Sequence, residues 1–292
     1  MNETGKIYPG TNDVVFKILF VNHKNYLRSL LSAFLEMPED DIFDIDIRNP
    51  DIPPNYIKEK FSRLDIHSSL KIRNEIKIVN IEMQNLSEDY YAERTLYCWS
   101  DIFKTSLDSG MSYDEVPVCV ALGVLNFRLF RDEEDSERVH SRFRIYRDDG
   151  KKLLTDKLDI HFIELPKVKA LDENETDMKK LWAKLLRART KEEFDMIEQR
   201  TSSSIIRDAS RSIQEISADE KNWHILRQRE KAEHDAISAL KYAKREGKAE
   251  GKAEGRAEGR AEGRAEERKA LIAKFRAAGV TDEVIQSVLN MQ

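Results

Sequence analysis

The 292-residue sequence has few cysteines, no long apolar run and no recognisable leader. Its two cysteines, Cys98 and Cys119, lie in apolar surroundings without the spacing of metal ligands, so we expect reduced core residues. No run of about 18 apolar residues could cross a membrane, and the first residues lack the basic and apolar segments of a signal peptide. These absences predict a cytoplasmic protein without a membrane partner.

The sequence also lacks an excess of basic charge. Its 49 lysines and arginines face 54 aspartates and glutamates, which gives a formal net charge of −5 and a pI near 5.8. Any contact with nucleic acid must therefore come from a local basic face. A P-loop, an HExxH helix, a CxxC pair and a nucleophile elbow are all missing from the sequence, which leaves those chemistries without support.

What the sequence does contain changes in character twice along the chain. Hydrophobic residues make up 40% and charged residues 35%, so the chain combines a substantial core with a very polar part. Residues 1–170 hold the prolines and the strand-like runs, and we expect them to form the core domain. Residues 171–246 have the pattern of successive polar helices, and residues 247–292 form a repeat followed by a short helical tail.

Periodicity in the core domain predicts helices and strands. Helices are expected at 13–20 (capped by Asn12 or Thr11), 24–36 and 88–107, the last ended by Gly110. Strands are expected at about 43–48, 61–70, 76–84, 116–127, 141–147 and 158–164, with an acidic solvated loop at 132–135. The run at 116–127 is nearly all apolar and should be buried on both faces. This order predicts an α/β fold in which a central sheet is flanked by helices, with a helical C-terminal extension.

Two carboxylates in adjacent strand-like segments are the candidates for a chemical site. If these segments pair through a two-residue turn at Arg73 and Asn74, facing residue numbers sum to 147 and Asp65 faces Glu82. Two carboxylates about 5 Å apart at Cβ repel unless a proton or a cation lies between them. Mg²⁺ prefers such oxygen ligands, and Gln84 projects from the same face as Glu82. The pattern therefore indicates a magnesium site.

An ordinary structural role is the alternative for each candidate, because isolated acids in strands usually face solvent. Asp13 starts a helix, where it could act as a third carboxylate or interact with the helix dipole. Arg94 could contact a phosphate or form an ion pair with a neighbour. Glu36 and His67 have weaker claims, as a helix-end acid and a lone strand histidine.

Short motifs in a fixed order carry a resemblance to a known family. They are TNDVVFK at 11–17, LDI at 64–66, NIEMQ at 80–84 and RTLYCWS at 94–100. The similarity continues through FIEL at 162–165, the helix around Trp182, SAD at 217–219 and REKA at 229–232. In this order they resemble the recombination-promoting nuclease and transposase family of the PD-(D/E)XK nuclease superfamily, over nearly the whole chain.

The resemblance implies a restriction-endonuclease-like core, Mg²⁺-dependent cleavage of DNA, and a link to recombination or mobile elements. Asp65 matches the motif aspartate and Glu82 the acidic residue of the (D/E)XK element, so both would bind the metal ion. Gln84 stands where the superfamily has its lysine, although this particular family commonly has glutamine there.

Glutamine changes the expected chemistry because it adds no positive charge to the site. A lysine would orient the attacking water or stabilise the transition state, whereas Gln84 can only hydrogen-bond. Candidate lysines that could replace the missing one are Lys17, Lys71 and Lys77. Because side chains alternate along a strand, Lys77 should project from the face opposite to Glu82 and Gln84. The alternative function is a catalytically weak or inactive DNA-binding or self-associating protein that keeps the nuclease fold.

The C-terminal part begins with a repeat of Gly-Lys/Arg-Ala-Glu at residues 247–266. In a helix this repeat places like charges four residues apart, and each glycine costs about 1 kcal/mol relative to alanine. It is therefore either a flexible charged spacer or a helix whose Gly and Ala rows let a second copy approach, which would give a homo-oligomer. Residues 271–278 should then be helical, with Gly279 ending this helix and Thr281 capping a final helix.

Overall fold

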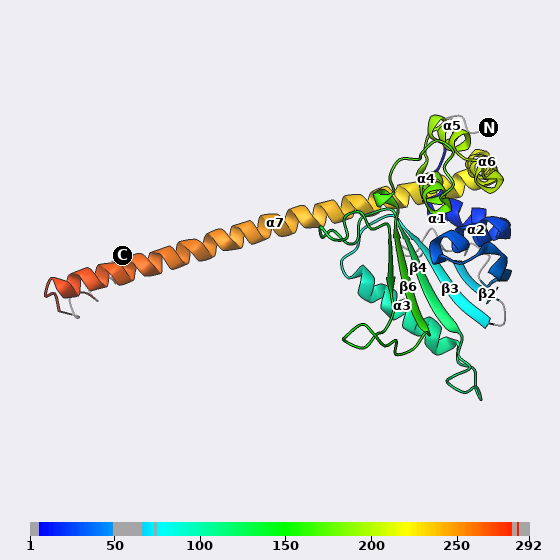
Figure 1. Cartoon of the computed structure of the whole chain (residues 1–292). Helices are drawn as coiled ribbons and strands as arrows, with labels where there is room; N and C mark the ends of the chain where they lie inside the picture. The colour runs from blue at the N-terminus through cyan, green and yellow to red at the C-terminus, as the bar shows by residue number, and fades with distance from the viewer. Residues whose placement is uncertain (1–5, 49–65, 73–74, 282–284, 286–292) are drawn as a thin grey trace. The chain divides into compact units, whose positions relative to one another are not determined.

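The computed structural model describes residues 6–48, 66–72, 75–281 and 285. The chain forms two compact units, Met1–Glu230 and Lys231–Gln292, and the first contains the sheet (Figure 1). The three-part division predicted from composition, with boundaries at residues 170 and 246, stays a prediction.

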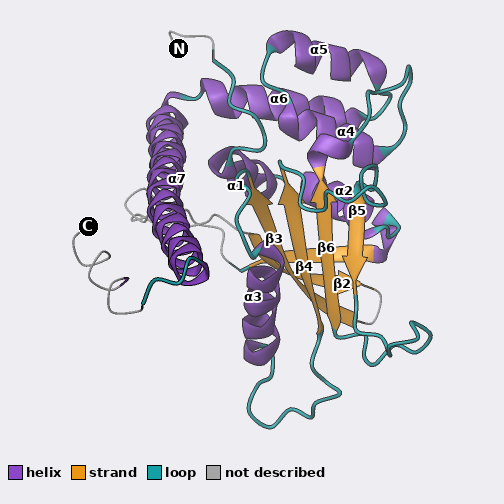
Figure 2. Ribbon diagram, turned by 90° about the vertical axis from the view of Figure 1, so that its left-hand side faces the viewer, coloured by secondary structure: helices purple, strands orange, loops and turns teal. Residues whose placement is uncertain are grey.

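A six-stranded mixed sheet forms the centre of the first unit, as Figure 2 shows. In chain order its strands are β1 (Ile42–Ile47), β2 (Ile66–Ile72), β3 (Glu75–Gln84), β4 (Val118–Leu125), β5 (His140–Phe143) and β6 (Leu158–Glu164). In space the order is β1-β2-β3-β4-β6-β5; β3, β4 and β6 are parallel, and the other neighbours are antiparallel. The predicted central mixed sheet is confirmed, and its three parallel strands bring their carboxyl ends to one edge.

The α-helices in the described residues are α1 (Asp13–Asn22), α2 (Lys24–Leu35), α3 (Tyr91–Thr105), α4 (Met178–Arg187), α5 (Lys191–Arg200), α6 (Ser204–Ala218) and α7 (Glu220–Ala277). Some of them cover the two faces of the sheet. On one face Val79, Ile81 and Leu122 join the large core that α1, α2, α4 and α6 complete. On the other face Ile78 and Cys119 pack against α3. Successive strand residues thus face opposite layers, as the two-residue period requires, and the predicted α/β arrangement with a helical extension is confirmed.

Two sequence features set local structure as expected. Asn12 caps α1, because its Oδ1 accepts the N–H groups of Val14 and Val15 at 3.1 and 3.2 Å. Strand β4 is buried along its whole length except at Val118, which agrees with a strand covered on both faces.

Two local expectations about α3 were wrong. The helix ends at Thr105 rather than at Gly110, which has a φ of 91° in the turn that follows. Cys98 is exposed, whereas Cys119 is buried as expected. At that turn of the helix the bulkier Trp99 covers the sheet instead, and its Nε1 donates to the carbonyl oxygen of Cys119 at 2.8 Å.

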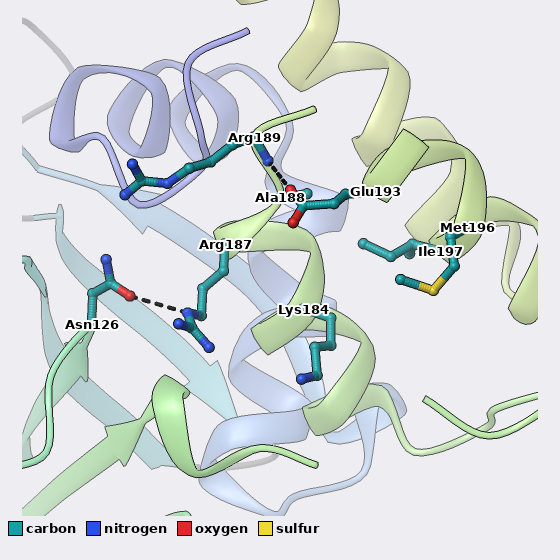
Figure 3. A pocket seen from close by; sticks show the side chains of 8 residues that line it. All are labelled: Asn126, Lys184, Arg187, Ala188, Arg189, Glu193, Met196 and Ile197. Carbon is teal, nitrogen blue, oxygen red and sulfur yellow. Dashed lines mark hydrogen bonds between the residues drawn. The ribbon is translucent and has the colours of Figure 1, made fainter. Parts of the chain in front are cut away.

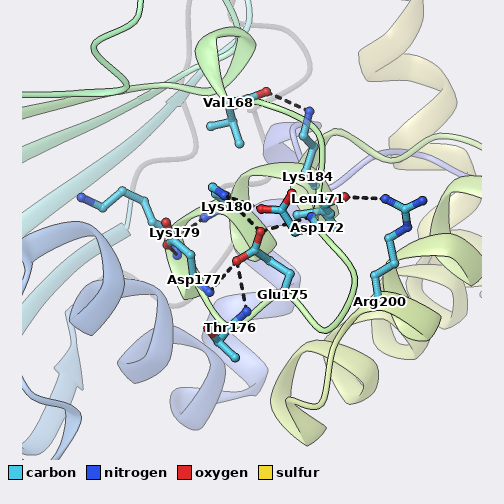
Figure 4. Close-up of polar contacts among 10 residues, drawn as sticks. All are labelled: Val168, Leu171, Asp172, Glu175, Thr176, Asp177, Lys179, Lys180, Lys184 and Arg200. Atoms are coloured by element: carbon cyan, nitrogen blue, oxygen red, sulfur yellow. Dashed lines mark hydrogen bonds and ion pairs between the residues drawn. The ribbon is translucent and has the colours of Figure 1, made fainter.

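One acid organises the connection between β6 and α4. Figure 4 shows Glu175 accepting hydrogen bonds from the backbone N–H groups of Asp172, Thr176 and Asp177, while Lys180 forms an ion pair with it at 3.1 Å. Burial raises the pKa of Glu175, but the backbone donors and Lys180 outweigh burial and hold the pKa below its ordinary value. This loop therefore fixes where α4 begins.

The C-terminal repeat is helical in the structure, since residues 247–266 lie within α7. Gly279 has a φ of 80° directly after this helix, which confirms its predicted place at the helix end. The predicted final helix lies outside the described residues except for Ile285. None of the helices in the described ranges is long and apolar enough to span a membrane.

Candidate metal centre and active site

Polar residues gather where the parallel strands end. Glu82 and Gln84 lie at the carboxyl end of β3, Asn126 directly follows β4, and Glu164 is the last residue of β6. In open α/β sheets, ligands bind outside the carboxyl ends of the parallel strands. This edge of the sheet is therefore the candidate site.

Glu82 is held by two donors from α3. Nη2 of Arg94 lies 2.9 Å from Oε1 of Glu82 and 3.2 Å from Oε2, and the Tyr91 hydroxyl donates to Oε2 at 3.3 Å. The Glu82 side chain is only 14% exposed. A carboxylate this buried is costly without compensation, so these donors stabilise its charged form and fix its direction.

Arg94 joins two acids at this edge. Its Nη1 donates to Glu88 at 2.6 Å while Nη2 contacts Glu82, and its guanidinium lies 4.7 Å from the centroid of the Tyr91 ring. Arg94 therefore forms ion pairs with neighbouring acids, which was one of the two roles considered for it from the sequence. Glu88 and Tyr91 were not sequence candidates; the three-residue spacing of Tyr91 and Arg94 on one helix face was the available signal.

Gln84 points toward the same acids. Its Nε2 donates to the carbonyl oxygen of Leu86 at 2.9 Å and to Oε1 of Glu88 at 3.3 Å. Its side-chain oxygen accepts no hydrogen bond from the residues that the structure describes. Gln84 therefore offers a neutral oxygen on the same face of β3 as Glu82.

A glycine opposite Glu82 makes room for these contacts. Gly123 of β4 pairs with Glu82 in the parallel register. A Cβ at this position would lie 3.0 Å from the Phe162 ring and 3.1 Å from the hydroxyl oxygen of Tyr91. The missing side chain thus allows Tyr91 to reach Glu82.

The hairpin register agrees with the one predicted from the sequence wherever it is described. Ile66 pairs with Ile81 and His67 with Asn80, so facing numbers sum to 147. Asp65, the proposed partner of Glu82, and the turn at Arg73 and Asn74 lie outside the described residues. The facing of Asp65 and Glu82 therefore stays a prediction.

The two hairpin lysines among the replacement candidates lie away from Glu82. Lys71 pairs with Ile76, and Lys77 pairs with Leu70, at the turn end of the hairpin. At ~3.3 Å per residue, Lys77 lies roughly 17 Å along the strand from Glu82. Neither lysine is placed to supply the missing charge.

The remaining candidates lie on helices or at their ends. Asp13 pairs with Arg229, whose Nε and Nη2 lie 2.9 and 2.6 Å from Oδ2 of Asp13. Glu36, at the end of α2, pairs with Lys179 at 2.6 Å. Lys17 is buried on α1. Asp13 and Glu36 are thus each engaged by a cation of another helix.

The donor set at this edge suits a hard divalent cation. Glu82 supplies carboxylate oxygens and Gln84 an amide oxygen, which are the ligand types that Mg²⁺ prefers. Within the described ranges, no group of three His, Cys, Asp or Glu side chains could enclose a metal ion. A complete ligand set therefore needs a residue from elsewhere, substrate phosphate or water, as is usual for Mg²⁺.

Comparison with known proteins finds one family. Residues 10–243 match the family described as PD-(D/E)XK nuclease family transposase, and this match covers the sheet and helices α1 to α6. No curated protein and no solved structure matches the chain. The matched range includes Glu82, Gln84 and Arg94.

Proposed function

Because the chain belongs to the PD-(D/E)XK nuclease family transposases and has their fold, we propose that it is a Mg²⁺-dependent DNA endonuclease linked to recombination or mobile elements. Asp65 and Glu82 bind the metal ion, and Gln84 contacts the attacking water or the phosphate. A bound divalent ion supplies a Lewis acid that polarises the phosphodiester and lowers the pKa of a water molecule.

Glu82 is the observation that carries this proposal. It is a nearly buried acid within an apolar strand, and side chains from a different element hold it in one direction. Arg94 and Tyr91 fix the direction of this carboxylate, and its negative charge can attract a cation. Gln84, on the same face, donates its N–H groups to Leu86 and Glu88, so its side-chain oxygen is the atom that can accept a hydrogen bond from the attacking water.

Cleavage of plasmid DNA by the full chain in Mg²⁺ tests the proposal. Glu82→Gln and Asp65→Asn should each lower the cleavage rate by on the order of 10²-fold or more, because each removes a charged ligand of the metal ion that stabilises the transition state. Glu93→Gln is the matched control, since Glu93 is an exposed acid on α3. Its cleavage rate should equal that of the wild type.

Equal cleavage by all four proteins would remove Asp65 and Glu82 from the site. Because Glu82→Gln also removes a partner of Arg94, its thermal unfolding should be measured beside its activity. Asp65→Asn provides the second variant, so the test does not depend on one substitution.

A catalytically weak DNA-binding protein is the second candidate function. The observation that favours it is that Gln84 brings no charge and that Arg94, the nearby cation, is bound to both Glu82 and Glu88. DNA binding without any cleavage by the wild type would support it. Self-association through the C-terminal helix is tested by light scattering after deletion of residues 247–292, where an unchanged number of chains per assembly would count against it.

A further inference from the structure

A cavity of about 490 Å³ opens beside the candidate site, at the end of α4 and the start of α5. Figure 3 shows Lys184, Arg187 and Arg189 around it, with Asn126 on one side and Glu193 on the other. Three cations thus line one hollow of a chain whose net charge is −5.

The three cations form no ion pair with an acid in the part of the chain that the structure describes. Lys184 donates to the carbonyl oxygen of Val168 at 2.8 Å and Arg187 donates from Nε to Oδ1 of Asn126 at 3.2 Å. No described acid forms an ion pair with Lys184, Arg187 or Arg189. Both terminal nitrogens of the Arg187 guanidinium therefore remain available to a ligand.

The acid in the cavity wall is already engaged. Oε2 of Glu193 accepts the backbone N–H groups of Arg189 and Thr190 at 2.7 and 3.2 Å, as part of the capping box that starts α5. Burial and the nearby charge of Arg187 lower the pKa of Lys184. Cations that crowd one another in this way favour an anion between them.

Backbone and side-chain contacts connect this cavity to the site on β3. Arg187 binds Asn126, and the N–H of Asn126 donates to the carbonyl oxygen of Gln84 at 2.9 Å. With strands ~4.8 Å apart and a rise of ~3.3 Å per residue, the cavity lies on the order of 10 Å from Glu82. Successive phosphates of one DNA strand turn around the helix as they advance ~3.4 Å along its axis, so this span reaches a phosphate that neighbours the one at Glu82.

We propose that the Lys184–Arg187–Arg189 cavity binds a backbone phosphate of the DNA that neighbours the one at Glu82. The inference rests on the proposed function. An arginine fork binds phosphate oxygens in pairs, and the lysine adds a point charge behind it. Such contacts fix the register of the DNA without reading its sequence.

DNA binding by the full chain at several salt concentrations, in the absence of divalent ions, tests the cavity directly. Fluorescence anisotropy of a labelled duplex gives the slope of log affinity against log salt. Arg187→Gln and Arg189→Gln should each reduce this slope by ~0.9 and weaken all duplex sequences equally. Between about 50 and 200 mM salt, the affinity of each variant then falls ~3.5-fold less than that of the wild type.

Lys151→Gln is the matched control. Lys151 is an exposed cation in the segment between β5 and β6, which lies at the amino end of β6 and thus at the opposite edge of the sheet. Its slope should equal that of the wild type. Arg187→Lys keeps the charge and should keep the slope, even though it loses the contact with Asn126.

Unchanged slopes in both glutamine variants, equal losses in the Lys151 control, or no DNA binding by the wild type would each overturn the proposal. The cleavage test is separate from this one. If Glu82→Gln loses cleavage but Arg187→Gln and Arg189→Gln keep the wild-type slope, the phosphate-binding role of the cavity is rejected and the proposed nuclease function is retained. If the two arginine variants have reduced slopes but Glu82→Gln still cleaves DNA, the cavity binds phosphate and the role of Glu82 in cleavage is rejected.

Discussion

Replacing Lys167 by methionine should destabilise the first unit strongly, because it leaves a buried charge without its partner. The side chains of Lys167 and Glu164 are both 0% exposed, and Nζ of Lys167 lies 2.6 Å from Oε2 of Glu164. Lys167 also donates to the carbonyl oxygen of Asp135 at 2.8 Å, and Oε1 of Glu164 accepts the N–H groups of Leu129 and Phe130. The pair thus holds the segment after β4 against the end of β6.

The size of the effect follows from what each substitution leaves behind. Removing one partner of a buried ion pair typically costs 3–5 kcal/mol, and we expect about 4 kcal/mol for Lys167→Met. In the double variant Glu164→Gln with Lys167→Met, both charges are gone and the cost should fall well below the sum of the two single costs. The coupling arises because the charge of each residue is costly only when the other is absent.

Urea unfolding at neutral pH, followed by the fluorescence of the buried Trp182, measures these free energies. With a slope of ~3 kcal/mol per molar, a loss of about 4 kcal/mol lowers the midpoint by more than about 1 M. A cost below about 1 kcal/mol for Lys167→Met would refute the reasoning. Additive costs in the double variant would also refute it, since they would mean that the two charges do not interact.

Two further predictions concern the site and the acid limb of stability. Gly123→Ala should lower the rate of DNA cleavage about tenfold or more, because the added Cβ would press on the Tyr91 hydroxyl that binds Glu82. Helix content measured by circular dichroism should change little. An unchanged cleavage rate would contradict this prediction. The hydrogen bond from Lys179 holds the pKa of Glu36 at about 2, below its ordinary 4.5. The stability that this interaction contributes is present above pH ~4.5 and is lost as the pH falls toward 2, so thermal unfolding of Glu36→Gln should depend less on pH in that window.

The elements and the hairpin register could be predicted because they depend on local or repeating patterns. The two-residue period of a strand and a short turn together determine which residues face one another, and the described pairs of β2 and β3 follow that register. The cap at Asn12 and the buried run of β4 are also local signals. The end of α3 was misplaced because a glycine with positive φ marks any left-handed turn as well as a helix end.

The contacts between distant elements could not be predicted. Arg94 meets Glu82 only because the first turn of α3 lies beside the carboxyl end of β3, and Arg187 meets Asn126 across 61 positions of sequence. Periodicity shows which face of an element is buried but not which charged residue of another element lies opposite. The buried Glu164–Lys167 pair was invisible for a related reason, since an acid and a lysine three residues apart usually mark an exposed helix face.

The position of Gln84 takes on a different meaning once these contacts are known. From the sequence, it was the place where a catalytic lysine is missing. In the structure Gln84 donates to Glu88, Glu88 binds Arg94, and Arg94 binds Glu82. A lysine at position 84 would compete with Arg94 for Glu88 and would weaken the hold on Glu82. The cation near Glu82, the proposed metal ligand, thus comes from α3, and a neutral, hydrogen-bonding residue at position 84 is compatible with it.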